Sequence, residues 1–329
     1  MKAVRILAAL VLVLLTAWAS MALAIDGPLA GRGGVCLGGA WFVAAVAAGF
    51  LVRPLSRAFL VVLVLDVSLA AWWLAIEPRN DRDWIAEVRH APRADFDGDV
   101  VRIHNVRNFF WRSDSDFDEV WEERTYDLSE VRAADLMFSY WGAPMIAHTI
   151  MSWEFADGRH LAISIETRKE AGEEYSALLG FFRQYELYYV VSDERDVVGV
   201  RTNVRGEDVF LYRLSAPPER ARHLLVDYLE RINKLADHPA WYNALTQNCT
   251  TTIWRHARSL DTRPAWDWRI LANGSADALL YLRGSVDTSM PFEELRRRSD
   301  VTAAAREAGH DENFSARIRL GRPRMTAAN

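Results

Sequence analysis

The residue with the clearest potential for chemistry in this chain of 329 residues is Cys249, one of only two cysteines. The other, Cys36, lies in an apolar stretch long enough to cross a bilayer, so we expect no disulfide between them. Asn248 precedes Cys249, and a helical pattern follows at 250–260. A cysteine at a helix N-terminus has a lowered pKa, which favours the nucleophilic thiolate. The alternative is a small buried core residue, which many free cysteines are.

Two alternating segments, 147–155 and 161–167, flank the turn sequence Ala156-Asp157-Gly158 and predict a β-hairpin. The apolar residues of both strands have odd numbers, so cross-strand partners must sum to an even number for one core. These residues are Met151, Trp153, Phe155, Leu161, Ile163 and Ile165. A three-residue loop with glycine in the left-handed conformation meets this condition by pairing Phe155 with Arg159.

The same register places His148 opposite Glu166, on the face that also carries Ser152 and Ser164. A thiol nucleophile requires a base within reach and a third group that orients the base. We therefore assign His148 as the candidate base and Glu166 as the candidate orienting acid. The alternative is an ordinary polar strand face exposed to solvent.

The remaining pattern of the C-terminal part predicts an α+β domain. Further strands are predicted at 100–103, 121–128, 187–191, 197–202 and 209–214. An amphipathic helix is predicted at 219–235, between the breakers Pro217-Pro218 and His238-Pro239. Beyond Arg298 we expect a helix or ordered strap and then a loose end.

Three apolar segments at 6–24, 35–52 and 59–76 each have the ~20 residues of a spanning helix. Basic residues precede the first and lie between the second and third, so everything after residue 76 is predicted outside the cytoplasm. A cleavable signal peptide ending at Ala22-Leu23-Ala24 is an alternative for the first segment, and it also exports the domain. Asp66 is an intramembrane carboxylate, either functional or bonded between helices.

The predicted organisation is a membrane anchor at 1–76, a linker at 77–104, a domain at 105–299 and a tail at 300–329. The net charge is −5, and no basic cluster interleaves with aromatics, so nucleic-acid binding has no support. The eight histidines lack metal-ligand spacing, and no nucleotide-binding motif occurs, so no cofactor or metal is expected.

Six segments in fixed order resemble the Lnb N-terminal periplasmic domain family. They are AHT at 147–149, SWEFADG at 152–158, SIETR at 164–168, GFFRQYEL at 180–187, RTNVR at 201–205 and NCTT at 248–251. The order His, acid, then a distant Cys on a helix also resembles circularly permuted papain-like enzymes of the NlpC and lecithin–retinol acyltransferase kind. The resemblance implies such a fold with an antiparallel sheet, with Cys249 as nucleophile, His148 as base and Glu166 as third member.

Lnb-type proteins are bacterial lipoprotein N-acyltransferases, so the resemblance implies an inner-membrane enzyme with a periplasmic site. The implied acyl donor is a phospholipid, and the implied acceptor is the N-terminal amine of a lipoprotein. The Cys249 N–H is the natural first oxyanion donor, with Asn248 and Tyr242 as candidates for the second. Arg168, Arg201 and Arg205 are candidate phosphate contacts, although strand-end arginines are usually solvated or ion-paired.

Two other classes of function remain open from the sequence. A hydrolase of cell-wall peptides or lipids would use the same three residues, and a peptidase predicts a polar open groove instead of an apolar acyl tunnel. A non-catalytic envelope protein would use the fold for binding and predicts no reactive thiol.

Overall fold

The computed structural model describes residues 2–29, 31–143, 145–259 and 265–323. They form two compact units. Unit 1 combines the N-terminal residues through Arg79 with the later segment Glu174–Glu186. Unit 2 contains Asn80–Glu173 and the chain from Leu187 onward.

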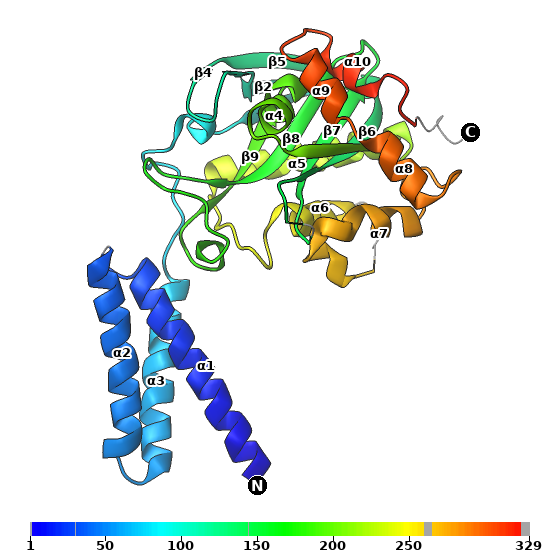
Figure 1. Ribbon diagram of the computed structural model, residues 1–329. Helices are drawn as coiled ribbons and strands as arrows, with labels where there is room; N and C mark the ends of the chain where they lie inside the picture. Colours follow the sequence, from blue (N-terminus) through cyan, green and yellow to red (C-terminus); the bar gives the residue numbers. More distant parts are fainter. Residues whose placement is uncertain (1, 30, 144, 260–264, 324–329) are drawn as a thin grey trace. The chain divides into compact units, whose positions relative to one another are not determined.

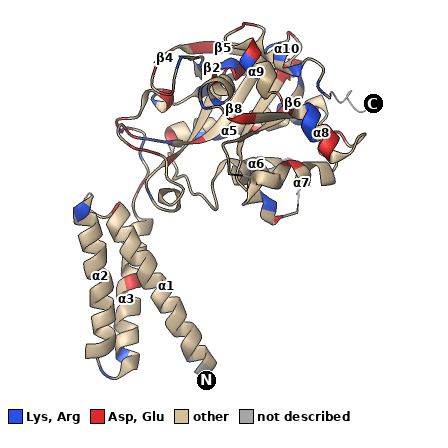
Figure 2. Cartoon of the chain, in the orientation of Figure 1, with Lys and Arg blue, Asp and Glu red and all other residues tan. Residues whose placement is uncertain are grey.

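Unit 1 contains three long apolar helices, α1 (Lys2–Asp26), α2 (Arg32–Leu51) and α3 (Leu55–Leu74). Each is long and apolar enough to cross a membrane, as predicted. Figure 2 shows that charged residues are concentrated in the rest of the chain. Gly34 and Gly38 are buried where α2 meets α1, and a Cβ at either would clash with α1 backbone oxygens. Small residues therefore let these two helices approach closely.

The intramembrane carboxylate Asp66 is fully buried and joins the three helices. Its Oδ2 accepts a hydrogen bond of 2.6 Å from Thr16 Oγ1 of α1, and its Oδ1 accepts one of 3.0 Å from Trp41 Nε1 of α2. Polar side chains that bond across helices are a usual means of association in lipid. These contacts support the helix-to-helix role for Asp66.

The segment Glu174–Glu186 packs on the outer end of α1. Asp26 Oδ2 accepts hydrogen bonds from Trp73 Nε1 at 2.6 Å and from the Arg183 backbone N–H at 3.2 Å. Phe182 is buried in an apolar cluster that includes α1 residues. Cleavage after Ala24 would remove Ala19 and Ala22 from this cluster and Thr16 from Asp66, so the structure favours a retained α1 over a signal peptide.

Unit 2 is built on a mixed sheet with the strand order β1-β2-β9-β8-β7-β6-β10, and β5 pairs with β2 outside this path. The strands are β1 (Arg93–Asp97), β2 (Val100–Arg107), β5 (Trp121–Asp127), β6 (Val131–Tyr140), β7 (His148–Phe155), β8 (His160–Arg168), β9 (Glu186–Ser192) and β10 (Asp208–Arg213). The short strands β3 (Phe110–Trp111) and β4 (Phe117–Asp118) form a separate ribbon. The predicted α+β class is confirmed. The β1–β2, β2–β5, β6–β7, β7–β8 and β6–β10 pairs are antiparallel, and β2 pairs with β9 in parallel.

Helices cover both faces of this sheet (Figure 1). The helical segments from Glu194 onward are α4 (Glu194–Val197), η4 (Val200–Val204), α5 (Pro218–Asp237), α6 (Cys249–Ser259), η5 (Trp268–Ile270), η6 (Asn273–Ser275), α7 (Ala276–Leu282), α8 (Phe292–Ser299), α9 (Thr302–Ala308) and α10 (Phe314–Arg319). The face that carries Trp153 packs against α5, where Trp153 Nε1 donates to the Ala221 carbonyl oxygen at 2.9 Å. The opposite face packs against α4, α9 and α10 in a second apolar cluster.

The hairpin register matches the prediction. The β7–β8 pairs include Ile150 with Ser164 and Trp153 with Leu161, so partners sum to an even number. Phe155 N donates to Arg159 O at 3.0 Å, and Gly158 has a φ of +84°. The three-residue loop with a left-handed glycine therefore sets the register, as expected for this turn chemistry.

Three features differ from the sequence predictions. The predicted strand at 197–202 is helical, because Asp193 caps α4 through the Arg195 N–H at 3.0 Å and η4 continues the helical path. The linker predicted at 77–104 contributes β1 and β2 to the sheet. The tail predicted from residue 300 contributes α9 and α10 to the core through residue 323, and its last residues lie outside the described ones.

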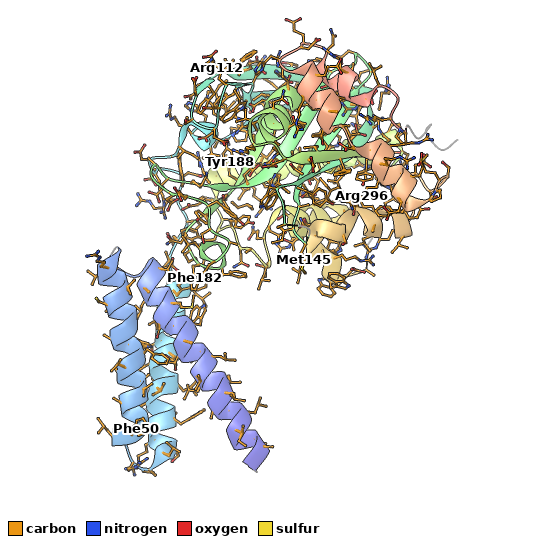
Figure 3. The ribbon with its side chains drawn as sticks, viewed as in Figure 1. Phe50, Arg112, Met145, Phe182, Tyr188 and Arg296 are labelled. Atoms are coloured by element: carbon orange, nitrogen blue, oxygen red, sulfur yellow. The ribbon has the colours of Figure 1, made fainter. Side chains whose placement is uncertain are left out.

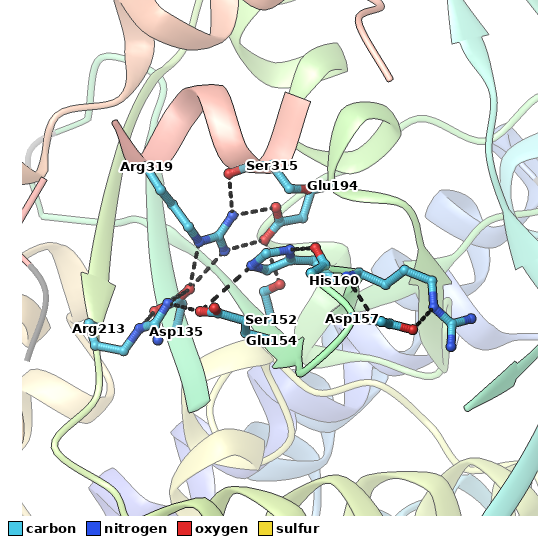
Figure 4. A network of polar contacts seen from close by, with 11 residues as sticks. Asp135, Ser152, Glu154, Asp157, His160, Glu194, Arg213, Ser315 and Arg319 are labelled. Atoms are coloured by element: carbon cyan, nitrogen blue, oxygen red, sulfur yellow. Dashed lines mark hydrogen bonds and ion pairs between the residues drawn. The ribbon is translucent and has the colours of Figure 1, made fainter. Parts of the chain in front are cut away.

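A buried charge network fixes α10 to the sheet (Figure 4). Arg319 is 3% exposed, and its guanidinium donates to Asp135 Oδ2 of β6 at 2.7 Å and to Glu194 Oε1 of α4 at 2.6 Å. Ser152 of β7 also donates to Glu194, at 2.5 Å. The polar face of the hairpin is therefore buried instead of solvated.

We expect Arg319→Ala to lower the free energy of unfolding by about 3–5 kcal/mol, because it leaves the buried carboxylate of Glu194 without its cation and Asp135 with Arg213 alone. Arg317→Ala is the matched control on the same helix. Its ion pair with Asp311, at 2.8 Å, is partly exposed and is worth about 1 kcal/mol or less. Denaturant unfolding in detergent measures both, and equal losses would contradict the burial argument.

Candidate active site

Cys249 is the first residue of α6, and a helix cap fixes its position. Asn248 Oδ1 accepts a hydrogen bond of 2.8 Å from the Thr251 N–H, and Asn248 Nδ2 donates one of 2.7 Å to the Ala244 carbonyl oxygen. Asn248 is thus the N-cap of α6 and does not occupy the oxyanion role considered from the sequence. The capped end places the thiol at the positive end of the helix dipole.

His148 and Glu166 lie side by side at one end of the β7–β8 hairpin. His148 Nε2 is 3.1 Å from Glu166 Oε1 and 2.6 Å from Ser164 Oγ. Ser164 Oγ in turn donates to Glu166 Oε1 at 2.6 Å. Ser164 was placed on this face by the register but was not selected as a site residue. With Nε2 engaged, Nδ1 is the ring nitrogen left for the thiol.

Cys249 and His148 are electrostatically coupled, and each changes the pKa of the other. Burial raises the pKa of Cys249, but the neighbouring His148 and the polar groups of Thr149 outweigh it and lower the pKa to about 7. Burial and the Arg201 charge lower the pKa of His148, but Glu166 and Cys249 outweigh them and raise it to about 9. Between these two values the thiolate–imidazolium pair is favoured.

Glu166 is held ionised by a second set of partners. Arg201 Nη2 donates to Glu166 Oε1 at 2.9 Å, and Arg201 Nη1 donates to Glu207 Oε2 at 3.3 Å. Burial raises the pKa of Glu166, but the charges of His148 and Arg201 outweigh it and hold this pKa well below its usual range. Arg201, predicted as a phosphate contact, is buried and instead positions Glu166.

The other predicted residues lie in different surroundings. Arg168 is buried and donates to the Val88 carbonyl oxygen at 2.9 Å, so it holds the segment around Val88 against the end of β8. Arg205 forms an ion pair with Asp114 at 2.8 Å. Neither arrangement supports a phosphate contact. Tyr242 is buried in the segment before α6, and its oxyanion role stays a prediction.

Asn273 is a residue of this site that the sequence reasoning missed. Its Oδ1 accepts from the Ala147 N–H at 2.8 Å, next to His148, and its Nδ2 is 3.9 Å from Cys249 Sγ. Nδ2 also donates to Thr250 Oγ1 at 2.5 Å. Asn273 therefore ties the start of β7 to the start of α6. Nδ2 also donates to the Ala147 carbonyl oxygen, so both of its protons are engaged and Asn273 is a positioning residue.

An apolar cavity of about 460 Å³ adjoins the residues that follow His148 and Cys249. This volume falls within the ~300–1,000 Å³ typical of ligand pockets. Its lining is mostly aliphatic and aromatic, from both β-strands and α-helices. Thr149 and Thr250 line it together with Leu136, Phe138, Met151, Leu214, Leu224, Ile253, Trp254, Ile270, Leu279 and Leu280.

A second cluster of titratable groups surrounds His256. His256 of α6 is buried between Asp227 Oδ2 at 2.5 Å and the Tyr189 hydroxyl at 2.8 Å. Within the part of the chain that the structure describes, no group of three or more His, Cys, Asp or Glu is placed to hold a metal ion.

The fold and the site define a membrane-anchored α+β protein with a histidine paired to a carboxylate and coupled to a cysteine at a helix N-terminus. Residues 117–274 match the sequence model of the Lnb N-terminal periplasmic domain. The predicted resemblance is confirmed, and the match contains Cys249, His148, Glu166 and Asn273. No curated protein and no solved structure gives a significant match. The three spans and this domain indicate a membrane-anchored protein with a periplasmic domain.

Proposed function

We propose that this chain is a thiol acyltransferase of the bacterial inner membrane. It moves an acyl chain from a phospholipid to the N-terminal amine of a lipoprotein, through a thioester on Cys249. The observation that carries the proposal is the Cys249–His148 pair beside an apolar cavity. A pKa of about 7 leaves about half of the thiol ionised at neutral pH.

In the first step the Cys249 thiolate attacks the ester carbonyl carbon of the phospholipid. The Cys249 N–H stabilises the oxyanion, and the carbon–oxygen bond of the ester then breaks. The leaving lysophospholipid alkoxide takes the proton of the His148 imidazolium. The products are a thioester and a neutral imidazole, which Glu166 keeps oriented.

In the second step the free amine of the lipoprotein attacks the thioester carbonyl carbon. His148 accepts the proton that the amine loses, and the carbon–sulfur bond breaks to release the thiolate. The amide product leaves, and the Cys249–His148 ion pair is restored. Dividing the transfer into two steps is the usual benefit of a covalent intermediate.

The cavity favours a lipid acyl chain over a wall peptide. A peptide needs polar partners along its backbone, whereas this lining is mostly hydrocarbon. Arg220 and Arg283 also line the cavity. Their charge would suit the phosphate of a lipid headgroup while the chain occupies the apolar part.

Intact-mass and peptide mass spectrometry of the purified full chain tests the proposal. After incubation with phospholipid and no acceptor, we expect a fatty acyl group on the peptide that contains Cys249. Adding a lipoprotein peptide with a free N-terminal amine should remove the group and acylate that amine. Cys36→Ser is the matched control, because it removes the other thiol and should retain the adduct.

Three results would count against the proposal. An absent adduct with every phospholipid tried would remove the thioester route. Release of free fatty acid without amine acylation would make the protein a lipid hydrolase. Cleavage of wall peptides would favour the peptidase alternative.

A further inference from the structure

The end of unit 2 that carries α6 and α7 exposes a group of large apolar side chains. We call these six residues the apolar rim: Met145, Ile146, Trp266, Trp268, Leu271 and Leu282. Each is between 39% and 68% exposed. Figure 3 shows Met145 at this end of the domain, near α6 and α7. Contiguous exposed apolar patches usually mark an interaction surface.

The rim belongs to the same elements that line the apolar cavity. Ile270 lines the cavity and lies between the exposed Trp268 and Leu271, and Leu280 lines it just before the exposed Leu282. Backbone contacts join the pieces. The Gly274 N–H donates to the Met145 carbonyl oxygen at 3.0 Å, which connects the β6–β7 loop to η6. The rim and the lining of the cavity therefore come from the same segments, 268–271 and 280–282.

Charge is scarce on these segments. Arg283 follows Leu282, and among the described residues of 141–147 and 265–275 the charged ones are Asp267 and Arg269. They form a two-bonded ion pair with each other, with both distances at 2.9 Å. Their charges are thus compensated locally. The rim also carries two tryptophans, a residue type enriched at membrane–water interfaces because its ring is apolar and its N–H is polar.

The three apolar helices of the same chain hold the domain at a membrane. Leu74 ends the third apolar helix, and Asn80 begins unit 2. Residues 75–79 can extend only roughly 20 Å, which keeps the start of the domain close to the bilayer surface. A lipid leaflet is therefore present near this surface at a high effective concentration, whereas any soluble partner must diffuse to it.

We propose that the apolar rim inserts into the outer leaflet of the bilayer that the three helices cross. Insertion removes the rim from water and places the cavity entrance at the level of the lipid acyl chains. The inference does not depend on the proposed acyl transfer, because a lipid-docked face requires no reactive thiol.

Single-site fluorescence in nanodiscs that hold one full-length chain each tests this inference. In a Cys36→Ser, Cys249→Ser background, Met145→Cys and Leu282→Cys each carry an environment-sensitive NBD label. Phe96→Cys on β1 is the matched control, since Phe96 is an exposed apolar residue 40% accessible outside the rim. We expect blue-shifted emission and strong quenching by nitroxide on lipid acyl chains at the two rim positions, with neither change at Phe96.

Quenching at the rim that does not exceed quenching at Phe96 would overturn the inference. Blue-shifted emission without nitroxide quenching would also overturn it, because the rim would then be covered by protein instead of lipid. Since each nanodisc holds one chain, a second copy cannot produce the expected quenching.

Discussion

Cys249→Ser and His148→Ala should each reduce N-terminal acylation of a reporter lipoprotein by ~10⁴-fold or more, to the limit of detection. A serine hydroxyl at this position stays protonated at neutral pH, and alanine removes the only imidazole in contact with Cys249 among the described residues. The measurement is N-acylation in cells that lack their own N-acyltransferase. Both variants should remain inserted and folded, because Glu166 keeps Ser164 and Arg201 as partners without His148, and serine replaces only the sulfur of Cys249.

Glu166→Gln should cost less than either. Glutamine retains an oxygen that accepts hydrogen bonds but loses the charge that favours the imidazolium. A charge-assisted hydrogen bond is worth ~1.5–3 kcal/mol, which corresponds to about 10- to 150-fold in rate. Activity that survives in Glu166→Gln and vanishes in His148→Ala would separate an orienting group from a reacting one.

A matched control uses another histidine paired with carboxylates. His104 lies 2.8 Å from both Asp95 and Glu123 on β1 and β5. His104→Ala should leave acylation unchanged. A wild-type rate in Cys249→Ser would show that the thioester route is wrong.

The second large effect concerns the reactivity of the thiol. In a Cys36→Ser background, we expect the rate of iodoacetamide alkylation to rise with pH through a midpoint near 7, the pKa of Cys249. His148→Ala should move this midpoint above 9, because burial still raises the pKa while the cation that lowered it is gone. At pH 7 the thiolate fraction then falls about 50-fold or more.

The sign of the pH dependence follows from the two pKa values. Below about 7 the thiol is protonated, and above about 9 the imidazolium loses its proton and the thiolate loses its cation. Acyl transfer should therefore rise through pH 7 and fall above pH 9. A midpoint near 9 in the wild-type protein would contradict the ion pair and favour a buried, inert cysteine.

The hairpin was predictable because two independent constraints agree. The apolar residues of both strands have odd numbers, so cross-strand partners must sum to an even number. A three-residue turn that contains Gly158 gives such a register. From this register alone His148 meets Glu166. The helix after Cys249 was predictable from its periodicity, and Asn248 marks its start, although the sequence did not separate a capping amide from an oxyanion donor.

Other features needed the tertiary structure. Strand β6 (Val131–Tyr140) was missed because it is buried on both faces and shows no polar alternation. The β-branched segment 197–202 predicted a strand, but the Asp193 cap and packing under α9 make it helical. Asn273 joins Ala147, Thr250 and Cys249 through contacts between segments far apart in the sequence, so local patterns do not reveal it.

The segment Glu174–Glu186 has a practical consequence for how this protein can be divided. The chain crosses from one unit to the other three times, before Asn80, after Glu173 and before Leu187. Removing residues 1–79 would therefore leave part of unit 1 behind, in the middle of unit 2's sequence. A secreted fragment that begins at Asn80 would carry Phe182 without its apolar partners, and Arg183 without Asp26. Such a fragment would expose the apolar side chain of Phe182 within the segment Glu174–Glu186, which favours aggregation. A single proteolytic cut near residue 79 would leave the domain held to the membrane through that insert.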